Sequence, residues 1–295
     1  MNKSTVQFGK GMAFLSPWLI GFVVFTLVPL GLSFYYSFCK YDLLTPPKYV
    51  GLQNYTGLMH DATFWQATGN TFYYGMMSLP ACLLVSLGMA MLLNVNVPGQ
   101  AAWRAIIFMP SLVPVVASAM VWMWLLNAKL GLVNAALALV HIDGPSWLAD
   151  PKWALPSLAM MSIWGVGNAV VIYLAGLQDV PRELYEAAEL DGAGPMRRMW
   201  NVTLPMLSPV IFFNLIMGII GTLKNFDLPY IMSVTAGLGP AHSAYLLSVD
   251  VYDNAFVYLR MGYASAMSWV LLVIVLALTG VAFWSSKKWV HHDEK

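Results

Sequence analysis

Charged side chains are concentrated in one short stretch of this 295-residue chain, between Asp179 and Arg198, where eight of them occur. Long apolar runs lie on both sides of the stretch. Each charge placed at the centre of a bilayer would cost about 2.5 kcal/mol or more, so the stretch must lie in water. A charged segment held between membrane segments can form ion pairs with another protein, and we interpret it as a docking element.

The residue types in this stretch predict a helix–turn–helix over residues 178–205. Asp179 is expected to cap a first helix, because its carboxylate can accept from the free N–H groups of the first turn. Gly192 is expected to end that helix in the left-handed conformation, which glycine adopts without strain. Pro195 is expected to open a second helix, which Pro205 would close or kink.

The stretch also resembles a known motif, the EAA loop of the permeases of ABC importers. The resemblance rests on Glu186-Ala187-Ala188, on Gly192 after three further residues, and on Val202, Leu204 and Pro205. The family usually has Ile where this chain has Val202. In this family two permease chains form the pore, and each loop docks a short coupling helix onto one of two ATPase subunits. The resemblance implies that the residues that contact the ATPase are Glu186, Ala187, Ala188, Asp191, Gly192 and Pro205.

The composition is that of an integral membrane protein. Hydrophobic residues make up 59% of the chain and charged residues 10%, and the mean hydropathy is +0.66. Soluble domains carry about 25% charged residues. A net charge of +1 gives no basic field for nucleic acid. Both cysteines, Cys39 and Cys82, lie in apolar runs and are expected to be small buried side chains, with no disulfide, metal or cofactor.

Uncharged runs long enough to cross a bilayer predict an all-α bundle of six membrane helices in a single permease domain, 1–295. The predicted spans are 14–38, 69–95, 105–126, 153–177, 206–223 and 263–284. The uncharged run 228–249 contains proline, glycine and hydroxyl residues and is expected to be an external loop. Six spans place both termini on one side. Nine Lys and Arg then lie on that side and six on the other, which favours cytoplasmic termini and a cytoplasmic loop 178–205.

The chain has no energy source of its own. It contains no Gly-x4-Gly-Lys-Ser/Thr sequence to hold ATP phosphates, and no His-Glu-x-x-His. None of the predicted spans contains an Asp, Glu, Lys or Arg, although proton-coupled carriers generally use such groups. We therefore expect a transport subunit that is not an enzyme, with ATP hydrolysed by separate subunits that dock onto the loop.

Uncharged spans favour a neutral, polyhydroxylated solute. Side chains in or beside the spans that suit a sugar are Trp164, Asn168, Thr222 and Asn225. In the family, polar residues of the fourth and fifth helices line the sugar site, which supports Asn168, Thr222 and Asn225. Trp164 could instead be a packing or interface aromatic. An importer of the same build for glycerol phosphate or a polyol remains an alternative, as does a membrane scaffold or sensor that does not transport.

The resemblance also implies partners and a location. After the fifth predicted span, the chain is similar to the branch whose permeases pair with a different permease; the similar residues are Asn225, Phe226, Asp227, Tyr230, Thr235, Gly237, Gly239 and Pro240. The expected partners are that second permease, a dimer of cytoplasmic ATPase subunits, an extracytoplasmic solute-binding protein, a neutral carbohydrate and membrane lipid. The expected location is the cytoplasmic membrane of a bacterium or archaeon, with several spans.

Overall fold

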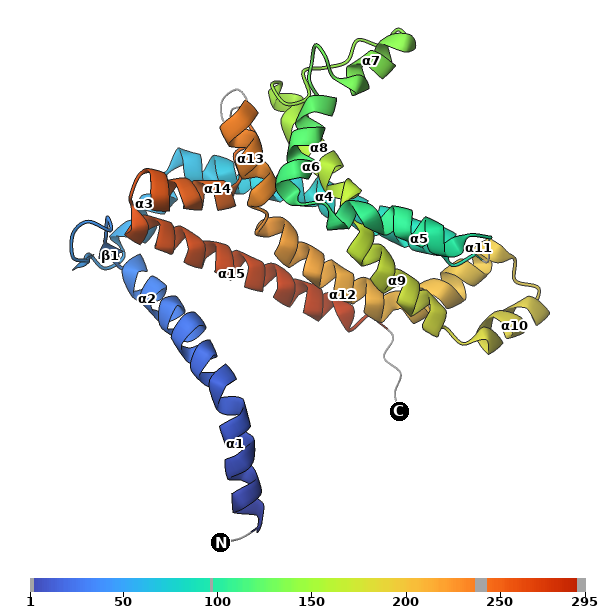
Figure 1. The fold of residues 1–295 in the computed structure, drawn as a ribbon, viewed down its shortest axis with the longest axis horizontal. Helices are drawn as coiled ribbons and strands as arrows, with labels where there is room; N and C mark the ends of the chain where they lie inside the picture. Colours follow the sequence, from blue (N-terminus) through green and yellow to red (C-terminus); the bar gives the residue numbers. More distant parts are fainter. Residues whose placement is uncertain (1–2, 96–97, 237–242, 291–295) are drawn as a thin grey trace. The chain divides into compact units, whose positions relative to one another are not determined.

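The computed structural model describes residues 3–95, 98–236 and 243–290, and within them the regular elements are helices apart from one short hairpin (Figure 1). The predicted all-α membrane bundle is confirmed. Gly237, Gly239 and Pro240 lie outside the described residues. Contacts group the chain into two compact units, described separately below. Unit 1 comprises residues 1–62 and 251–272, and unit 2 comprises 63–250 and 273–295.

Four helical segments are long and apolar enough to cross a membrane, or up to six if each of two bent helix pairs counts as one span. The first is Gly11–Ser37, which includes most of α1 (Lys3–Phe22), a π-helical turn (Val23–Leu27) and α2 (Val28–Ser37). The others include α4 (Ala62–Leu93), α12 (Leu204–Leu223) and α15 (Met261–Ser286). The helix that contains the predicted span 69–95 therefore begins earlier, at Ala62.

The predicted spans 105–126 and 153–177 are each broken into two helices. α5 (Gln100–Phe108) and the 3-10 turn Met109–Leu112 meet α6 (Val115–Leu125) at a 95° bend. The break contains Pro114, which has no N–H to donate and keeps the residue before it extended. α8 (Pro151–Trp164) and α9 (Gly167–Asp179) meet at a 51° bend at Gly165 and Val166.

Unit 1 is built around the hairpin of β1 (Cys39–Lys40) and β2 (Lys48–Tyr49), which follows α2 and precedes α3 (Gln53–His60). The amide of Asn54 donates to the carbonyl oxygens of Ser37 (2.8 Å) and Cys39 (2.9 Å). The start of α15 lies against this hairpin, because the N–H of Gly262 donates to the carbonyl of Tyr41 (3.1 Å). The π-helical turn Asp253–Val257 also belongs to this unit.

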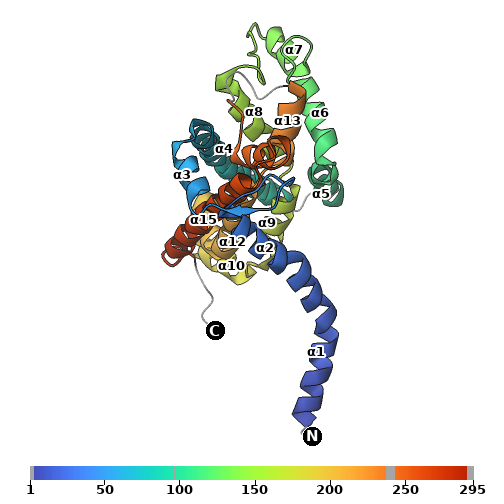
Figure 2. The same ribbon diagram turned by 90° about the vertical axis from the view of Figure 1, so that its left-hand side faces the viewer.

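The core of unit 2 forms where α9 lies beside α12. Buried side chains of this cluster include Tyr173 and Leu177 of α9 and Leu207 of α12. α7 (Leu132–Leu139) and α10 (Arg182–Leu190) lie at opposite ends of this unit, as both ribbon views show (Figures 1 and 2). The side of the membrane on which the loop 178–205 lies stays a prediction.

Part of the predicted external loop 228–249 is helical, which corrects the sequence-based expectation. α13 (Asp227–Ala236) packs against α6, with Leu228 and Met232 in the same buried cluster as Ala119. Pro229 lies in the first turn of α13, where a missing N–H costs nothing. α14 (Leu247–Tyr252) begins in the same run. Burial against α6 therefore outweighs the loop-forming composition.

Candidate functional sites

The charged stretch folds as the expected helix–turn–helix of α10 and α11 (Pro195–Arg198). Gly192 has φ +77°, the left-handed conformation predicted for it. Its N–H donates to the carbonyl of Glu189 (2.9 Å), and the N–H of Ala193 donates to that of Ala188 (2.8 Å). These two bonds form a Schellman motif, which satisfies carbonyl groups at the end of α10 and reverses the chain.

Two local predictions for this stretch are wrong. Asp179 does not cap α10, because α9 continues as far as Asp179 and Val180 follows in an extended conformation, 7% exposed. Pro205 does not close the second helix either, and the alternative that it kinks this helix stays a prediction. α11 passes through the π-helical turn Met199–Thr203 directly into α12, and Pro205 lies in the first turn of α12.

Two side-chain contacts attach α10 to the helix that follows it. The hydroxyl of Tyr185 lies 3.0 Å from Oγ1 of Thr203, which is in the π-helical turn. Arg198 of α11 donates to the carboxylate of Glu189 in an ion pair. Tyr185, Ala188 and Glu189 share one face of α10 by helical spacing. We call it the inward face, because Tyr185 and Ala188 are half-buried there, although Glu189 stays exposed. The turn is therefore held in one geometry relative to α12.

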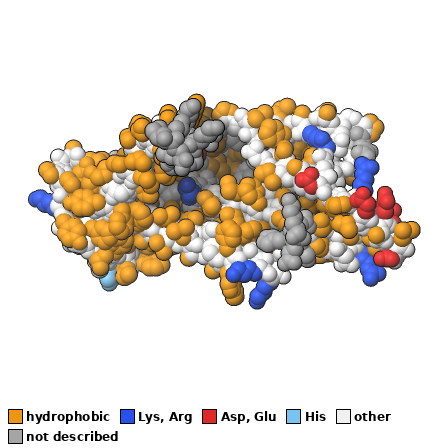
Figure 3. All heavy atoms as spheres, turned by 90° about the horizontal axis from the view of Figure 1, so that it is seen from below, with side chains coloured by type: hydrophobic (Ala, Val, Ile, Leu, Met, Phe, Trp, Pro, Cys, Tyr) orange, Lys and Arg blue, Asp and Glu red, His pale blue; other side chains and the backbone are white. Residues whose placement is uncertain are grey.

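The opposite face of α10 is exposed and consists of Glu183, Glu186, Ala187 and Leu190. Leu190 is 90% exposed, and among the described residues Glu186 forms no ion pair. Acidic and basic side chains gather at this end of unit 2 in the space-filling view (Figure 3). We expected Ala187 and Ala188 to receive a partner together, but only Ala187 belongs to this exposed face of α10. Ala188 is half-buried on the inward face.

A pocket of about 440 Å³ lies in unit 2 among α4, the bend between α8 and α9, and α12. Most of its lining is apolar, and we call it the polar pocket because of the amides and hydroxyls that it also contains. It brings together three of the predicted solute residues: Asn168 of α9, Thr222 of α12, and Asn225 just after α12. No side chain that lines it is charged. Gly165 and Val166, at the bend, also line it. Irregular backbone at membrane depth is tolerated where it faces protein or a watery cavity, so this bend fits a solute site.

Trp164, the fourth predicted solute residue, does not join this pocket. It lines a neighbouring, more apolar pocket and packs edge-to-face on Trp122, with ring centroids 6.1 Å apart. The structure adds polar residues that the sequence analysis did not select, among them Tyr74 of α4 and Ser162 of α8, which line the polar pocket. The only signal for them in the sequence is a hydroxyl within an apolar span, which does not indicate the face it occupies.

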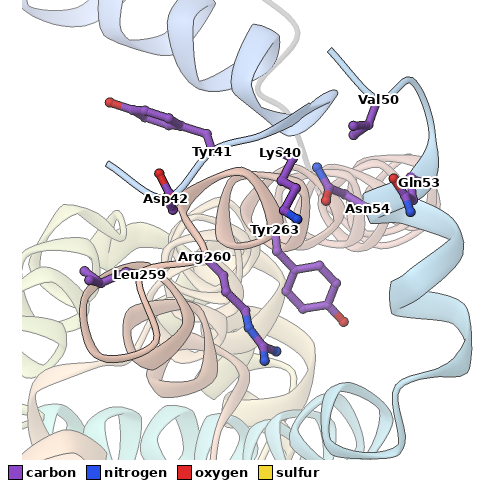
Figure 4. Close-up of a pocket in the computed structure, with 9 residues that line it drawn as sticks. All are labelled: Lys40, Tyr41, Asp42, Val50, Gln53, Asn54, Leu259, Arg260 and Tyr263. Carbon is purple, nitrogen blue, oxygen red and sulfur yellow. The ribbon is translucent and has the colours of Figure 1, made fainter. Parts of the chain in front are cut away.

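Unit 1 contains a separate polar pocket of about 320 Å³ between the hairpin and the loop before α15 (Figure 4). Lys40 and Arg260 enter it from these two segments, and Tyr263 lies beside them and donates to Asp61 (2.7 Å). The N–H and the hydroxyl of Thr45 both donate to Asp42, and this lowers the pKa of Asp42 below its ordinary value. Among the described residues, no cluster of His, Cys, Asp or Glu could hold a metal.

Comparison with known proteins gives a consistent picture. Residues 83–290 match the family described as "Binding-protein-dependent transport system inner membrane component". The probable ABC transporter permease protein YesP of Bacillus subtilis is 41% identical, with 97% of this chain and 93% of that protein covered. The sulfoquinovosyl glycerol transport system permease protein SmoG of Agrobacterium fabrum is 33% identical, with 90% and 87% covered. 

The fold is also that of a solved transporter. A chain in the crystal structure of a bacterial alginate ABC transporter, in complex with an alginate pentasaccharide-bound periplasmic protein, superimposes with a TM-score of 0.82. The two chains are 23% identical, and the match covers 97% of this chain and 96% of that one. At this identity the likeness supports the fold alone.

Proposed function

Because this chain belongs to the family of binding-protein-dependent inner membrane transport components, we propose that it carries a neutral sugar or oligosaccharide through its polar pocket in an ATP-driven importer. The main support for this proposal is that Asn168, Thr222 and Asn225 line one pocket that has no charged side chain in its lining. Amides and hydroxyls can exchange hydrogen bonds with sugar hydroxyls, and the apolar walls can contact the sugar ring. A volume of about 440 Å³ is within the usual range for ligand pockets.

The helices connect this pocket with the exposed face of α10. α9 begins at the bend beside Asn168 and ends at Asp179, three residues before α10 begins. On the other side, α11 continues through the π-helical turn into α12, which carries Thr222. The distance from Thr203 to Thr222 along α12 is roughly 30 Å. A displacement of α10 and α11 therefore moves two walls of the pocket.

In this proposal the exposed face of α10 docks into a groove on a cytoplasmic ATPase subunit, through Leu190, Ala187 and Glu186. ATP binding closes an ATPase dimer, and the docked helices α10 and α11 then shift the pore between its inward-facing and outward-facing states. The free energy of the docked contacts must differ between those states, because contacts of equal free energy in both would not shift the equilibrium between them. A second, different permease completes the pore, and a solute-binding protein delivers the sugar from outside. The chain lies in the cytoplasmic membrane with both termini cytoplasmic.

The solute class is tested with purified importer reconstituted in liposomes. Several relatives are named as transporting trehalose and maltose, lactose or arabino-oligosaccharides, and one as transporting sn-glycerol 3-phosphate. Uptake of maltose, trehalose, lactose, arabinotriose and sn-glycerol 3-phosphate should be measured with and without ATP. We expect ATP-dependent uptake of at least one neutral sugar. Uptake of glycerol phosphate alone would contradict the proposal, because the pocket offers no cation to balance a phosphate.

The docking role predicts that Glu186→Lys loses the ATPase. Reversing an exposed, unpaired charge should leave the fold intact, because it breaks no contact within the described chain. A tag on this chain should therefore recover the second permease from membranes with either form, and at least about tenfold less ATPase subunit with Glu186→Lys. Asp143→Lys, the same charge reversal at an exposed carboxylate in the loop after α7, is the matched control and should recover as much ATPase as wild type. Equal ATPase recovery with all forms would contradict docking through Glu186.

A further inference from the structure

A chain of hydrogen-bonded side chains runs along one wall of the polar pocket. The amide nitrogen Nδ2 of Asn225 lies 2.7 Å from the hydroxyl oxygen of Tyr74, which lies 2.7 Å from Oγ of Ser162. Ser162 in turn donates to the carbonyl of Leu158, one helical turn earlier (3.0 Å). Tyr74 is only 2% exposed, so its hydroxyl must find its partners within the protein. These hydrogen bonds connect α4, α8 and the break after α12.

The last bond determines the direction of the others. A hydroxyl has one proton to donate. Ser162 gives its proton to Leu158, so its oxygen accepts from Tyr74. Tyr74 has then used its own proton, and its oxygen accepts from the amide nitrogen of Asn225. This order sets the orientation of the Asn225 amide, with the nitrogen toward Tyr74. The oxygen Oδ1 of Asn225 has no partner among the described residues.

The backbone of Asn225 is held as well. Its carbonyl accepts from Oγ of Ser248 in α14, at 2.5 Å. The N–H of Leu247 donates to Oγ1 of Thr71 at 2.9 Å, one helical turn before Tyr74 on α4. Asn225 lies in the break between α12 and α13, and its N–H donates to the carbonyl of Thr222 in the last turn of α12 (3.3 Å). Both ends of this residue are therefore attached to other helices.

We propose that Tyr74 is a positioning residue of the solute pocket, which orients the Asn225 amide so that its oxygen Oδ1 accepts a hydroxyl of the sugar. The inference rests on the proposed function, since it assigns a role within the same pocket. Its physical basis is preorganisation: an amide already held in its binding orientation loses less conformational freedom when the solute arrives. Tyr74 acts through Asn225 and needs no contact of its own with the sugar.

The test is Tyr74→Phe, which removes the hydroxyl and keeps the buried ring. The probe is whichever sugar among maltose, trehalose, lactose and arabinotriose the wild-type complex takes up fastest. The readout is the number of sugar molecules moved per ATP hydrolysed. We expect this ratio to fall about fivefold, as for the loss of one hydrogen bond. A folding defect alone would reduce the amount of intact complex. It would therefore lower the uptake rate and the ATPase rate equally and leave their ratio unchanged.

Two further variants show whether Tyr74 acts through Asn225. In the Asn225→Ala background, Tyr74→Phe is expected to lower the ratio no further, because the group that it orients is gone. Tyr173→Phe is the matched control, a buried tyrosine of α9 outside the pocket, and is expected to match wild type. An unchanged ratio in Tyr74→Phe, or additive losses in the double variant, would overturn the positioning role alone. A wild-type complex that moves none of the four sugars contradicts the proposed function and this inference with it.

Discussion

A Gly192→Val variant is expected to insert and assemble normally but to lose at least about nine-tenths of ATP-driven uptake. Gly192 has φ +77°, and a β-branched residue in that conformation is strained by about 2 kcal/mol. No atom lies within 4 Å of a Cβ placed there, so the backbone angle alone opposes the substitution. A strain of about 2 kcal/mol corresponds to a factor of roughly 30 in an equilibrium constant, so a relaxed geometry of the turn would be favoured over the native one by that factor. The exposed face of α10 would then no longer be presented as in the wild type.

The measurement is uptake of a transported sugar into liposomes, together with ATPase activity in the presence of the loaded solute-binding protein. Gly194→Val is the control, two residues further on and equally open, where φ is −67° and ψ is 168°. Valine favours such an extended conformation, so this variant should transport as wild type does. Normal uptake by Gly192→Val would show that coupling does not depend on the geometry of this turn.

A Gly262→Ala variant is expected to lose most of its folded protein. A Cβ at this position would lie 2.0 Å from the carbonyl oxygen of Cys39 and 3.1 Å from that of Tyr36. Both are backbone atoms, so no rotamer change can relieve the clash, and the start of α15 must move away from the hairpin. Such overpacking costs about 1–3 kcal/mol or more. The bond from the Gly262 N–H to Tyr41 is lost with it.

Thermal unfolding in detergent, followed by fluorescence-detected size exclusion, measures the effect. Gly280→Ala is the matched control in the same helix, because no atom lies within 4 Å of its Cβ position. Alanine is the better helix former by about 1 kcal/mol, so the control should be as stable as wild type or slightly more so. If Gly262→Ala and Gly280→Ala unfold at the same temperature, the close approach of α15 to the hairpin is not formed in the folded protein.

Local chemistry made several features predictable from the sequence. The apolar runs indicated the membrane spans, because their length and lack of charge are set by the bilayer and not by neighbouring helices. Gly192 and Pro195 indicated the turn between α10 and α11, because each residue has a backbone preference of its own. Asn168 and Thr222 stood out as polar groups in apolar surroundings, and Asn225 was selected through the resemblance to the family. Their assembly in one pocket agrees with that selection, and their role in binding stays a prediction.

Only the tertiary structure decided how these residues meet. Trp164 and Asn168 are four residues apart and would share one face of a straight helix. The 51° bend between α8 and α9 separates them, so they line different pockets. Tyr74 lies in a helix that is apolar on all sides, and its hydroxyl gains a role only because Ser162 and Asn225 reach it. Sequence determined the elements through local preference and hydrophobicity, whereas long-range packing decided which of their faces meet.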